Sequence, residues 1–460
     1  MIEFLDRKEE RSRVSRLLDN PEGALCCLYG RRRCGKTRLL QECAKGRKNV
    51  VYHLADKADR SAQIARLVRD VSLITPAFRA AEGNDWGTVL DLWMGLAPHG
   101  SILILDEFPY LVQRDESLPS VLQRICDALP DSGNKIVICG SSQRMMQGFV
   151  LKQSEPLYGR AREILHIAPL TFEWMCAAFP KWSQFDRLKA WGVWGGVPRY
   201  WEFQSEDEDL WQCVRRNVCS PLGVLRNEPQ FLLLDDCGDV AQAATVLSFI
   251  GGGAHRVAEV ASRMGKQVTD MPRPMKRLSD LGLIAKDLPF GSDGHCKRSY
   301  YRIADPFLDF WYTFVQPNLS RQDFLETVEE RMAFDAQYNV YLGGVWERIV
   351  RDALSRKHLP GDVRRWRNAA RWWGTGIGGR PMEIDVVAES TDGDSLLVGE
   401  AKLSLSGTEA EYAVRELEAK ARQLPFADKY KRIDTRLFVA RNPPVGAVSI
   451  DWCESCLNIS

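Results

Sequence analysis

The sequence predicts an α/β protein of several domains. At 460 residues the chain is long enough for roughly two to four domains, each with its own core. Up to about residue 170, short apolar runs alternate with longer amphipathic stretches, which is typical of β/α units around a buried parallel sheet. These runs cover residues 25–29, 50–54, 102–105 and 136–139. Strand-like runs form a second group beyond residue 381, which predicts a separate α/β unit there.

Between these two units the pattern changes twice. Residues 1–170 are expected to form the sheet domain, and residues 171–235 show only helical periodicity and loops, which predicts a helical subdomain. Residues 236–315 show three helices followed by strand-like runs around 283–287 and 299–303, an order that suits a winged helix. After a linker at 316–321, a domain over 323–460 is expected. Its predicted elements are helices near 341–356 and 408–424 and strands at 382–388, 395–402, 435–440 and 447–450.

Composition excludes several classes of protein. With 62 Lys and Arg against 61 Asp and Glu, the overall charge does not indicate nucleic-acid binding, so any basic surface must be local. The 13 cysteines lack the regular spacing of a disulfide framework, which predicts reduced thiols. No window offers about 18 uncharged apolar residues, and the N-terminus has charges where a signal peptide needs an apolar run. A cytoplasmic protein without a membrane span is expected.

The most specific motif lies at residues 30–37. Gly-Arg-Arg-Arg-Cys-Gly-Lys-Thr fits the P-loop pattern, follows an apolar run and precedes a stretch that can begin a helix. The two glycines let backbone N–H groups surround phosphate oxygens, and a helix N-terminus adds a favourable dipole. A chance glycine-rich turn is the alternative. The motif predicts ATP with Mg²⁺, Lys36 on the β and γ phosphates and Thr37 on the metal. The expected nucleotide-binding residues here are Gly30, Arg31, Arg32, Arg33, Cys34, Gly35, Lys36, Thr37 and Arg38.

A second signal supports the first. The run Ile-Leu-Ile-Leu at 102–105 is followed by Asp106 and Glu107, the arrangement of a buried strand that ends in two acids. Asp106 is expected to hold Mg²⁺ through water, and Glu107 to polarise the water that attacks the phosphate. An ordinary strand followed by a solvated acidic turn is the alternative. A glutamate at this place favours hydrolysis over binding alone.

Two further features are compatible with phosphate contacts. Ser141 follows the run 136–139, where its hydroxyl can sense a γ-phosphate, although serine is also a good helix N-cap. Arg160 and Arg162 can meet phosphate charge in their own chain or from a neighbouring subunit, and the second case requires a homo-oligomer. Surface solvation is the alternative for either arginine.

Together these residues resemble the prokaryotic archaeal-type ATPases, on the STAND and AAA+ side of the P-loop NTPases. The similarity includes the box Phe4-Leu-Asp-Arg7, which in the family lies near the adenine, and Leu105-Asp106-Glu107. The family's Gly-x-Pro turn, similar to Gly196-Val-Pro198, implies that Pro198 touches the nucleotide and reports its state. Asp305-Pro-Phe307 resembles the family's end of the winged helix, and the C-terminal domain resembles the PD-(D/E)XK nuclease superfamily, with its restriction-endonuclease-like fold.

The expected winged helix carries a feature that weakens base reading. A helix that reads the major groove should be unbroken, yet Pro272 and Pro274 fall inside the second predicted helix and shorten it or delay its start to near Pro274. Phosphate contacts are still open to nearby basic residues, namely Arg273, Lys276, Arg277, Lys297 and Arg298, with a solvated face as the alternative.

Carboxylates in the C-terminal domain suggest a second site. Two strands joined by a turn would place Glu383 and Asp385 on one face, and Glu400 and Lys402 on one face of the partner strand. Asp385 and Glu400 have the spacing of Mg²⁺ ligands, and Lys402 can orient or deprotonate a water. They match the D and ExK of the nuclease superfamily, in which Glu347 falls where many members have a further acid. A half-exposed hairpin with polar residues on its solvent face is the alternative.

Two functions therefore compete. The first is an ATP-hydrolysing enzyme that acts on DNA, with a Mg²⁺-dependent endonuclease-like domain. The second is a nucleotide-dependent regulatory switch, whose C-terminal domain binds DNA or a protein partner without cutting. Intact Glu107, Asp385, Glu400 and Lys402 favour the first.

Overall fold

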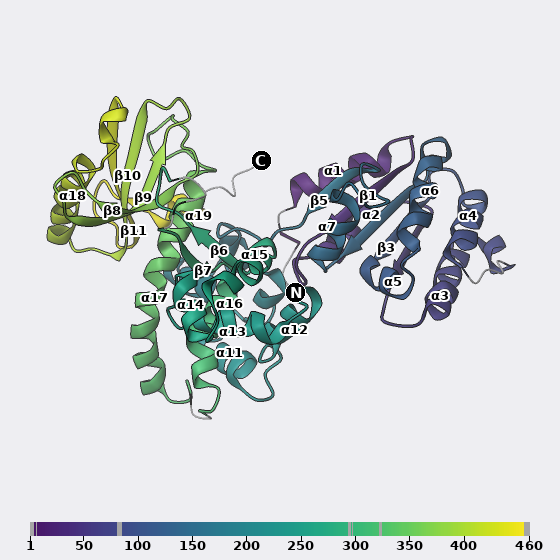
Figure 1. Cartoon of the computed structure of the whole chain (residues 1–460), viewed down its shortest axis with the longest axis horizontal. Helices are drawn as coiled ribbons and strands as arrows, with labels where there is room; N and C mark the ends of the chain where they lie inside the picture. Colours follow the sequence, from purple (N-terminus) through teal and green to yellow (C-terminus); the bar gives the residue numbers. More distant parts are fainter. Residues whose placement is uncertain are drawn as a thin grey trace.

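The chain forms two lobes (Figure 1). The computed structural model describes residues 4–5, 7–80, 85–292, 296, 298–321 and 324–454. The first lobe holds the sheet of residues 24–166, and the second holds the elements from α8 (Trp174–Ala178) to the C-terminal sheet. Within the described residues, no helix combines the length and apolar character needed to cross a membrane.

The first lobe is built on a five-stranded sheet in the order β2-β3-β4-β1-β5, with every pair parallel. Alternate residues of its strands enter two separate hydrophobic clusters, so both faces are covered, as in parallel sheets generally. The strands are β1 (Ala24–Tyr29), β2 (Val50–Leu54), β3 (Ile102–Asp106), β4 (Lys135–Gly140) and β5 (Ala161–His166). The first four confirm the predicted runs, whereas β5 was not predicted.

Helices cover this sheet in the alternation that the sequence predicts. They are α1 (Lys8–Asp19), α2 (Lys36–Ala44), α3 (Arg60–Ser72), η1 (Pro76–Ala80), α4 (Trp86–Leu96), α5 (Phe108–Arg114), α6 (Leu118–Ser132) and α7 (Gln143–Leu151). Since parallel strands all end at one edge of the sheet, the loops after β1, β3 and β4 meet there.

The middle of the chain is helical up to residue 280. The first group is α8, α9 (Gln184–Trp194), α10 (Pro198–Trp201), α11 (Leu210–Val214), the π-helical turn η2 (Arg215–Cys219) and α12 (Glu228–Asp236). The second is α13 (Val240–Gly251), α14 (Val257–Arg263), η3 (Val268–Asp270) and α15 (Pro272–Asp280), before the antiparallel hairpin of β6 (Ile284–Asp287) and β7 (Tyr300–Ile303). Pro272 begins α15, so both prolines lie in its first turn, where backbone N–H groups need no helical partner.

The C-terminal part differs from expectation at its start. After α16 (Pro306–Phe310), η4 (Trp311–Val315) and η5 (Gln316–Asn318), α17 runs from Val328 to Leu354. The expected helix near 341–356 is therefore only the second half of a helix of 27 residues. Its first half is amphipathic and packs Phe334 and Tyr338 into an aromatic cluster with Phe310. The expected boundary at residue 323 lies outside the described residues.

The C-terminal sheet is mixed, in the order β12-β11-β10-β9-β8. Its strands are β8 (Ala370–Thr375), β9 (Pro381–Glu389), β10 (Ser395–Ser404), β11 (Arg432–Arg441) and β12 (Val448–Ser449). The remaining helices are α18 (Gly407–Arg422), η6 (Ala427–Lys429) and α19 (Ile450–Glu454), so the strand expected at 447–450 is shorter than predicted. β8 was not predicted.

The second lobe is one body because its parts share buried contacts. Arg187 of α9 forms a two-pronged ion pair with Glu454 of α19, at 2.8 Å for both bonds, and both side chains are buried. Lys189 pairs with Asp335 of α17 at 2.8 Å. The helical segment is thus fixed to the C-terminal elements.

Candidate nucleotide site and C-terminal carboxylate cluster

The P-loop connects β1 to α2. A side chain at Gly30 would place its Cβ 2.3 Å from the carbonyl oxygen of Ile167, so the close approach of this backbone requires glycine. Gly35 has φ +90°, a left-handed conformation, with open space where a Cβ would project. Lys36 is buried and donates hydrogen bonds to the carbonyls of Gly30 at 2.8 Å and Arg31 at 3.0 Å. The loop thus curls around its own lysine.

The end of β3 lies beside this loop. Oδ2 of Asp106 accepts hydrogen bonds from the hydroxyls of Thr37 at 2.8 Å and Tyr52 at 2.5 Å. Oδ1 accepts from the backbone N–H of Glu107 at 3.0 Å. Asp106 is 1% exposed, so its carboxylate is fixed by these bonds. The sequence predicted that Thr37 and Asp106 would meet, and it gave no sign of Tyr52.

Glu107, which follows β3, is hydrogen-bonded to Ser141, which follows the neighbouring strand β4. Ser141 donates to Oε2 of Glu107 through its hydroxyl at 2.9 Å and its backbone N–H at 3.2 Å. Glu107 has φ +54°, which is rare for a residue with a side chain and marks a constrained position. Arg32 donates to the same serine hydroxyl at 3.3 Å and to the hydroxyl of Tyr110. The two acids, the serine and the loop therefore occupy one edge of the sheet.

The other two loop arginines contact the second lobe. Arg31 forms a buried ion pair with Asp305 and donates to the hydroxyl of Tyr200 at 3.0 Å. Tyr200 donates in turn to Glu228 at 2.8 Å, and Arg33 approaches the other oxygen of Glu228 at 2.9 Å. Nearby, Ser142 donates to Asp236 at 2.8 Å, and Gln143 donates to the carbonyl of Leu281 at 3.4 Å. These contacts between the lobes gather around the P-loop.

Residues expected near the adenine line one small pocket. Its walls are formed by Phe4, Leu5, Arg7, Cys34, Gly35, Arg38, Leu170, Pro198 and Glu202. The guanidinium of Arg38 lies 5.6 Å from the ring centre of Phe4. Arg7 donates to the carbonyls of Cys34, at 3.3 Å, and Ala168. The structure therefore brings the N-terminal box, the P-loop and the Gly-x-Pro turn together.

Arg160 lies elsewhere. It precedes β5, whose residue Ala161 pairs with Leu25 at the start of β1, so it sits at the edge of the sheet opposite the P-loop. Its guanidinium pairs with Asp127 at 3.2 Å. Arg162 pairs with Glu22 at 2.6 Å. The expected contact of Arg160 with a nucleotide in its own chain is therefore wrong, because the unpredicted strand β5 turns it away.

In the C-terminal domain, the expected carboxylates occupy neighbouring strands and α17. Asp385 is 9% exposed, and its Oδ2 accepts from the backbone N–H of Ala401 at 3.0 Å. Burial, followed by the charge of Glu347, raises the pKa of Asp385. Glu347 itself pairs with Arg351 at 3.3 Å, and Arg351 also donates to the carbonyl of Asp385. Glu347 and Asp385 therefore lie close enough to interact electrostatically.

The lysine and the second acid form an ion pair. Nζ of Lys402 lies 2.7 Å from Glu400, and Lys420 of α18 lies 3.8 Å from the same carboxylate. Burial lowers the pKa of Lys402, but its bond to Glu400 and the nearby acids outweigh this, so the pKa is raised. Lys402 is thus a cation paired with Glu400.

Glu383 does not join this cluster. Its carboxylate is half exposed and forms an ion pair with Arg371 of β8, so Glu383 points away from the cluster although strand alternation would place it on the same face as Asp385. Across residues 4–454 as described, no group of three or more His, Cys, Asp and Glu side chains is placed to hold one metal ion.

The β6–β7 hairpin is docked on the C-terminal sheet. The backbone N–H of Phe290 donates to the carbonyl of Arg371 at 2.9 Å, and its ring lies 5.5 Å from that of Phe426. Tyr300 packs on Trp373, with ring centres 4.9 Å apart. Lys297, one of the basic residues considered for phosphate contacts, lies outside the described residues. The face of the hairpin that packs on β8 is therefore covered by the C-terminal sheet.

Comparison with known proteins agrees with the geometry of the first lobe. Residues 4–202 match the model of a family described as an ATPase domain predominantly from Archaea. This segment is therefore similar to an archaeal-type ATPase domain. Residues 311–413 match a second family, described as Archaea bacterial proteins of unknown function. An uncharacterized protein of Methanocaldococcus jannaschii is 28% identical over 432 residues, 93% of this chain and 94% of the relative.

The fold of about two thirds of this chain is shared with a solved structure. A Walker-type ATPase of Pyrococcus abyssi is 19% identical and matches 67% of this chain and 96% of its own, with a TM-score of 0.52. The ORC2 protein of Aeropyrum pernix, in its ADPNP–ADP complexes, is 15% identical and matches 69% of this chain and 95% of its own, with a TM-score of 0.47.

Several residues that surround the P-loop were missed by sequence reasoning. Tyr52 lies in the middle of an ordinary-looking strand, and Glu228 and Asp236 lie on a helix without a motif. Asp305 lies in the segment that resembles the family's end of the winged helix, and that resemblance implies no contact with the P-loop. A signal did exist for the acids, because three consecutive arginines in one loop must find counter-charges when they are buried.

Proposed function

We propose that this chain binds ATP with Mg²⁺ and hydrolyses it at the P-loop. The observation that carries the proposal is the meeting of Thr37, Asp106 and Glu107 at the end of β3, beside Lys36. A Cβ at Gly30 would clash with the backbone of Ile167, and a side chain at Gly35 would be strained by the left-handed conformation there. Both positions therefore suit the glycines of a phosphate-binding loop. The Thr37 hydroxyl and the Asp106 carboxylate are hard oxygen donors of the kind that Mg²⁺ prefers.

The residues have separate tasks in this account. Lys36 exchanges its two backbone carbonyls for phosphate oxygens, while Phe4 and Arg38 bound the pocket that takes the base. Mg²⁺, when bound, neutralises phosphate charge and acts as a Lewis acid. Glu107 accepts a proton from the attacking water once Ser141 releases its carboxylate, and Ser141 is then free to donate to a phosphate oxygen.

Binding is tested by substitution of the P-loop lysine. Lys36→Ala removes the cation aimed at the phosphates and is expected to abolish binding of a fluorescent ATP analogue and ATP turnover. Lys135→Ala is the matched control, because Lys135 is equally buried, also bonds a backbone carbonyl and lies at the opposite edge of the sheet. Unchanged nucleotide affinity in Lys36→Ala would refute the assignment.

A second function is favoured by the C-terminal cluster. We propose that Asp385 and Glu400 hold Mg²⁺ for cleavage of DNA, with Lys402 orienting water and Glu347 setting the charge around Asp385. The specific support is a buried aspartate whose carboxylate is fixed by Ala401 and lies near Lys402 and Glu347. Glu400 must break its ion pairs with Lys402 and Lys420 before its carboxylate can bind a metal. We therefore expect weak Mg²⁺ binding, in the millimolar range.

The test compares two acids of one strand. Asp385→Ala should abolish Mg²⁺-dependent nicking of supercoiled plasmid, whereas Glu383→Gln, two residues away and paired outside the cluster, should leave it unchanged. If the wild-type protein cuts no form of DNA, with or without ATP, the nuclease proposal fails. The alternative proposal, a nucleotide-dependent switch whose C-terminal domain binds DNA or a protein partner, then remains.

Partners and organisation follow as part of the same proposal. We assign the three-helix and hairpin segment at 236–315 to a winged helix, which would contact DNA through phosphates from exposed residues such as Arg273 and Lys276. Arg160 would meet a nucleotide only in a neighbouring subunit of a homo-oligomer. Light scattering with and without ATP tests this last point, and a monomer under both conditions would rule out a role for Arg160.

A further inference from the structure

One pair of charges joins the P-loop to the second lobe. Arg31 is the second residue of the P-loop, and Asp305 follows β7 of the second lobe by two residues. Their side chains are 10% and 6% exposed, so water screens the pair little. Asp305 also accepts from the backbone N–H of Leu308 at 2.8 Å, which fixes it as the N-cap of α16.

The pair is placed to respond to phosphate. The backbone carbonyl of Arg31 is one of the two that hold Lys36, so any move of Lys36 toward a phosphate alters the loop at this residue. Phosphate also brings negative charge to a loop whose arginines are neutralised by Asp305 and Glu228. Because like charges repel in a poorly screened site, a bound nucleotide disfavours the pairing of Arg31 with Asp305.

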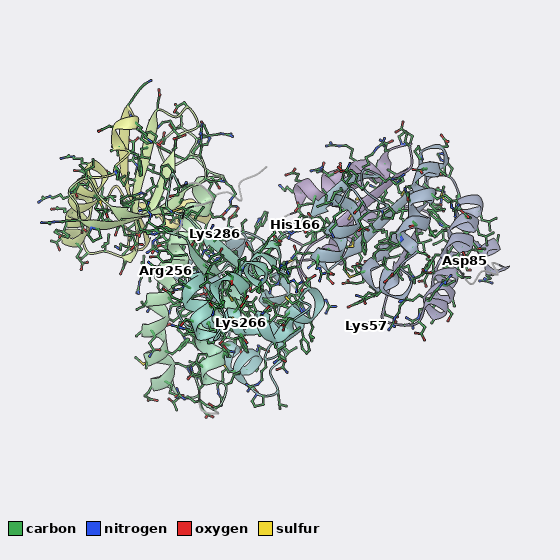
Figure 2. All side chains as sticks on the ribbon, viewed as in Figure 1. Lys57, Asp85, His166, Arg256, Lys266 and Lys286 are labelled. Atoms are coloured by element: carbon green, nitrogen blue, oxygen red, sulfur yellow. The ribbon has the colours of Figure 1, made fainter. Side chains whose placement is uncertain are left out.

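From Asp305 a short rigid path leads to the C-terminal sheet. Ala304 donates to the carbonyl of Leu283 at 2.8 Å, which closes the base of the β6–β7 hairpin beside Asp305. Each strand has four residues, or about 13 Å of length. The far end carries Tyr300 and Phe290, which contact Trp373 and Arg371 of β8. Figure 2 shows Lys286 of β6 at this junction with the C-terminal sheet domain.

The path ends next to the carboxylate cluster. Trp373 of β8 pairs in register with Glu383 of β9, two residues before Asp385. Arg371, whose carbonyl accepts from Phe290, also pairs with Glu383. A shift of the hairpin tip therefore acts on the strand that carries Asp385 through one intervening strand.

We propose that the β6–β7 hairpin transmits the nucleotide state of the P-loop to the C-terminal sheet, with the Arg31–Asp305 pair as the contact that a bound phosphate breaks. The inference rests on the proposed nucleotide binding and adds the regulation of the C-terminal site. Without nucleotide, the pair holds the hairpin against β8; with nucleotide, the base of the hairpin is released and its contact with β8 loosens.

The experiment uses amide hydrogen exchange on the full chain, with and without ATPγS and Mg²⁺. In the wild type, nucleotide is expected to speed exchange in β8 and β6. Asp305→Asn keeps a side chain able to cap α16 but removes the charge. It should bind nucleotide, show fast exchange in β8 at the outset and lose the nucleotide-dependent difference. Asp239→Asn, at the N-cap of α13, is the matched control and should behave as the wild type.

Phe290→Ala removes the ring that packs on Phe426 at the other end of the hairpin. It tests the inference independently if Asp305→Asn fails to fold. It should retain nucleotide binding and lose the response of β8. The inference is overturned if wild-type protein with bound nucleotide shows no change in β8, or if both variants keep the wild-type response. A separate titration with a fluorescent nucleotide identifies the remaining case, absence of binding, in which the proposed function fails and this inference fails with it.

Discussion

The hydroxyl of Tyr52 lies 2.5 Å from Oδ2 of Asp106, the oxygen that also accepts from Thr37. Tyr52 comes from β2 and Asp106 from β3, and the two strands are paired in register, with Tyr52 opposite Ile104. Burial, together with the charge of Asp106, raises the pKa of Tyr52, so the phenol stays protonated and remains a donor. Tyr52 therefore sets the rotamer of the carboxylate that is proposed to serve Mg²⁺.

Tyr52→Phe is expected to raise the Mg²⁺ concentration needed for half-maximal ATP turnover by about two- to tenfold, the value of one hydrogen bond. Nucleotide affinity without Mg²⁺ should change little. A magnesium titration of phosphate release measures this. Tyr430→Phe is the control, because Tyr430 donates to Glu389 at 2.9 Å far from the P-loop. An unchanged magnesium requirement in Tyr52→Phe would contradict the positioning role.

Arg187→Met tests what joins the second lobe. It leaves Glu454 buried without its partner, which is expected to cost about 3–5 kcal/mol of unfolding free energy. Arg215→Met breaks a half-exposed pair of the same lobe, with Glu326 at 2.7 Å, and should cost at most about 1 kcal/mol.

Urea denaturation followed by tryptophan fluorescence separates the two cases. Of the 14 tryptophans, all but Trp86 and Trp93 lie beyond residue 170, so the signal reports mainly on the second lobe. Equal effects of the two substitutions would mean that the buried pair does not hold the lobe together.

Asp385→Asn should stabilise the protein at neutral pH by about 1 kcal/mol, since it keeps an acceptor for Ala401 and removes a buried charge. The raised pKa of Asp385 means that folding favours its protonated form. Its contribution is therefore favourable in acid and is lost as pH rises from its ordinary pKa through the raised one.

The gain from Asp385→Asn should accordingly shrink as the pH is lowered from 8 to 4, which thermal denaturation across this range measures. Glu383→Gln, at a half-exposed acid of the same strand, should show no such trend. A gain independent of pH, or a loss of stability at neutral pH, would contradict the assignment of Asp385 as a buried, unfavourably charged group.

Local patterns predicted the first lobe well because a parallel sheet buries its strands on both faces. β1 is an apolar run followed directly by the P-loop, and β3 is an apolar run that ends at the first of two acids. In both cases the strand and the functional residues are adjacent in the sequence. β5 was missed because half of its sequence, Ala-Arg-Glu-Ile-Leu-His, is polar, as suits an edge strand partly covered by α1. The misplacement of Arg160 follows from that omission.

What could not be predicted lies in contacts between distant segments. Asp305 is 274 residues from Arg31, and Tyr52 is 54 residues from Asp106. No local periodicity contains such a pairing. β8 could not be predicted for the same reason. Its arginines and tryptophans are compatible with a nucleic-acid surface as well as with a strand, and the contact of Trp373 with Tyr300 comes from a distant segment.

The central claim is that the P-loop hydrolyses ATP, and one measurement tests it most directly. Phosphate release should be compared between wild-type protein and Glu107→Gln at saturating ATP and Mg²⁺, with nucleotide occupancy measured on the same samples. The wild type is predicted to turn over, and Glu107→Gln to bind ATP equally while losing turnover by about 10²–10⁴-fold, the contribution of a positioned general base. Wild-type protein that is fully occupied yet releases no phosphate, or a variant that releases it at the wild-type rate, would contradict the account.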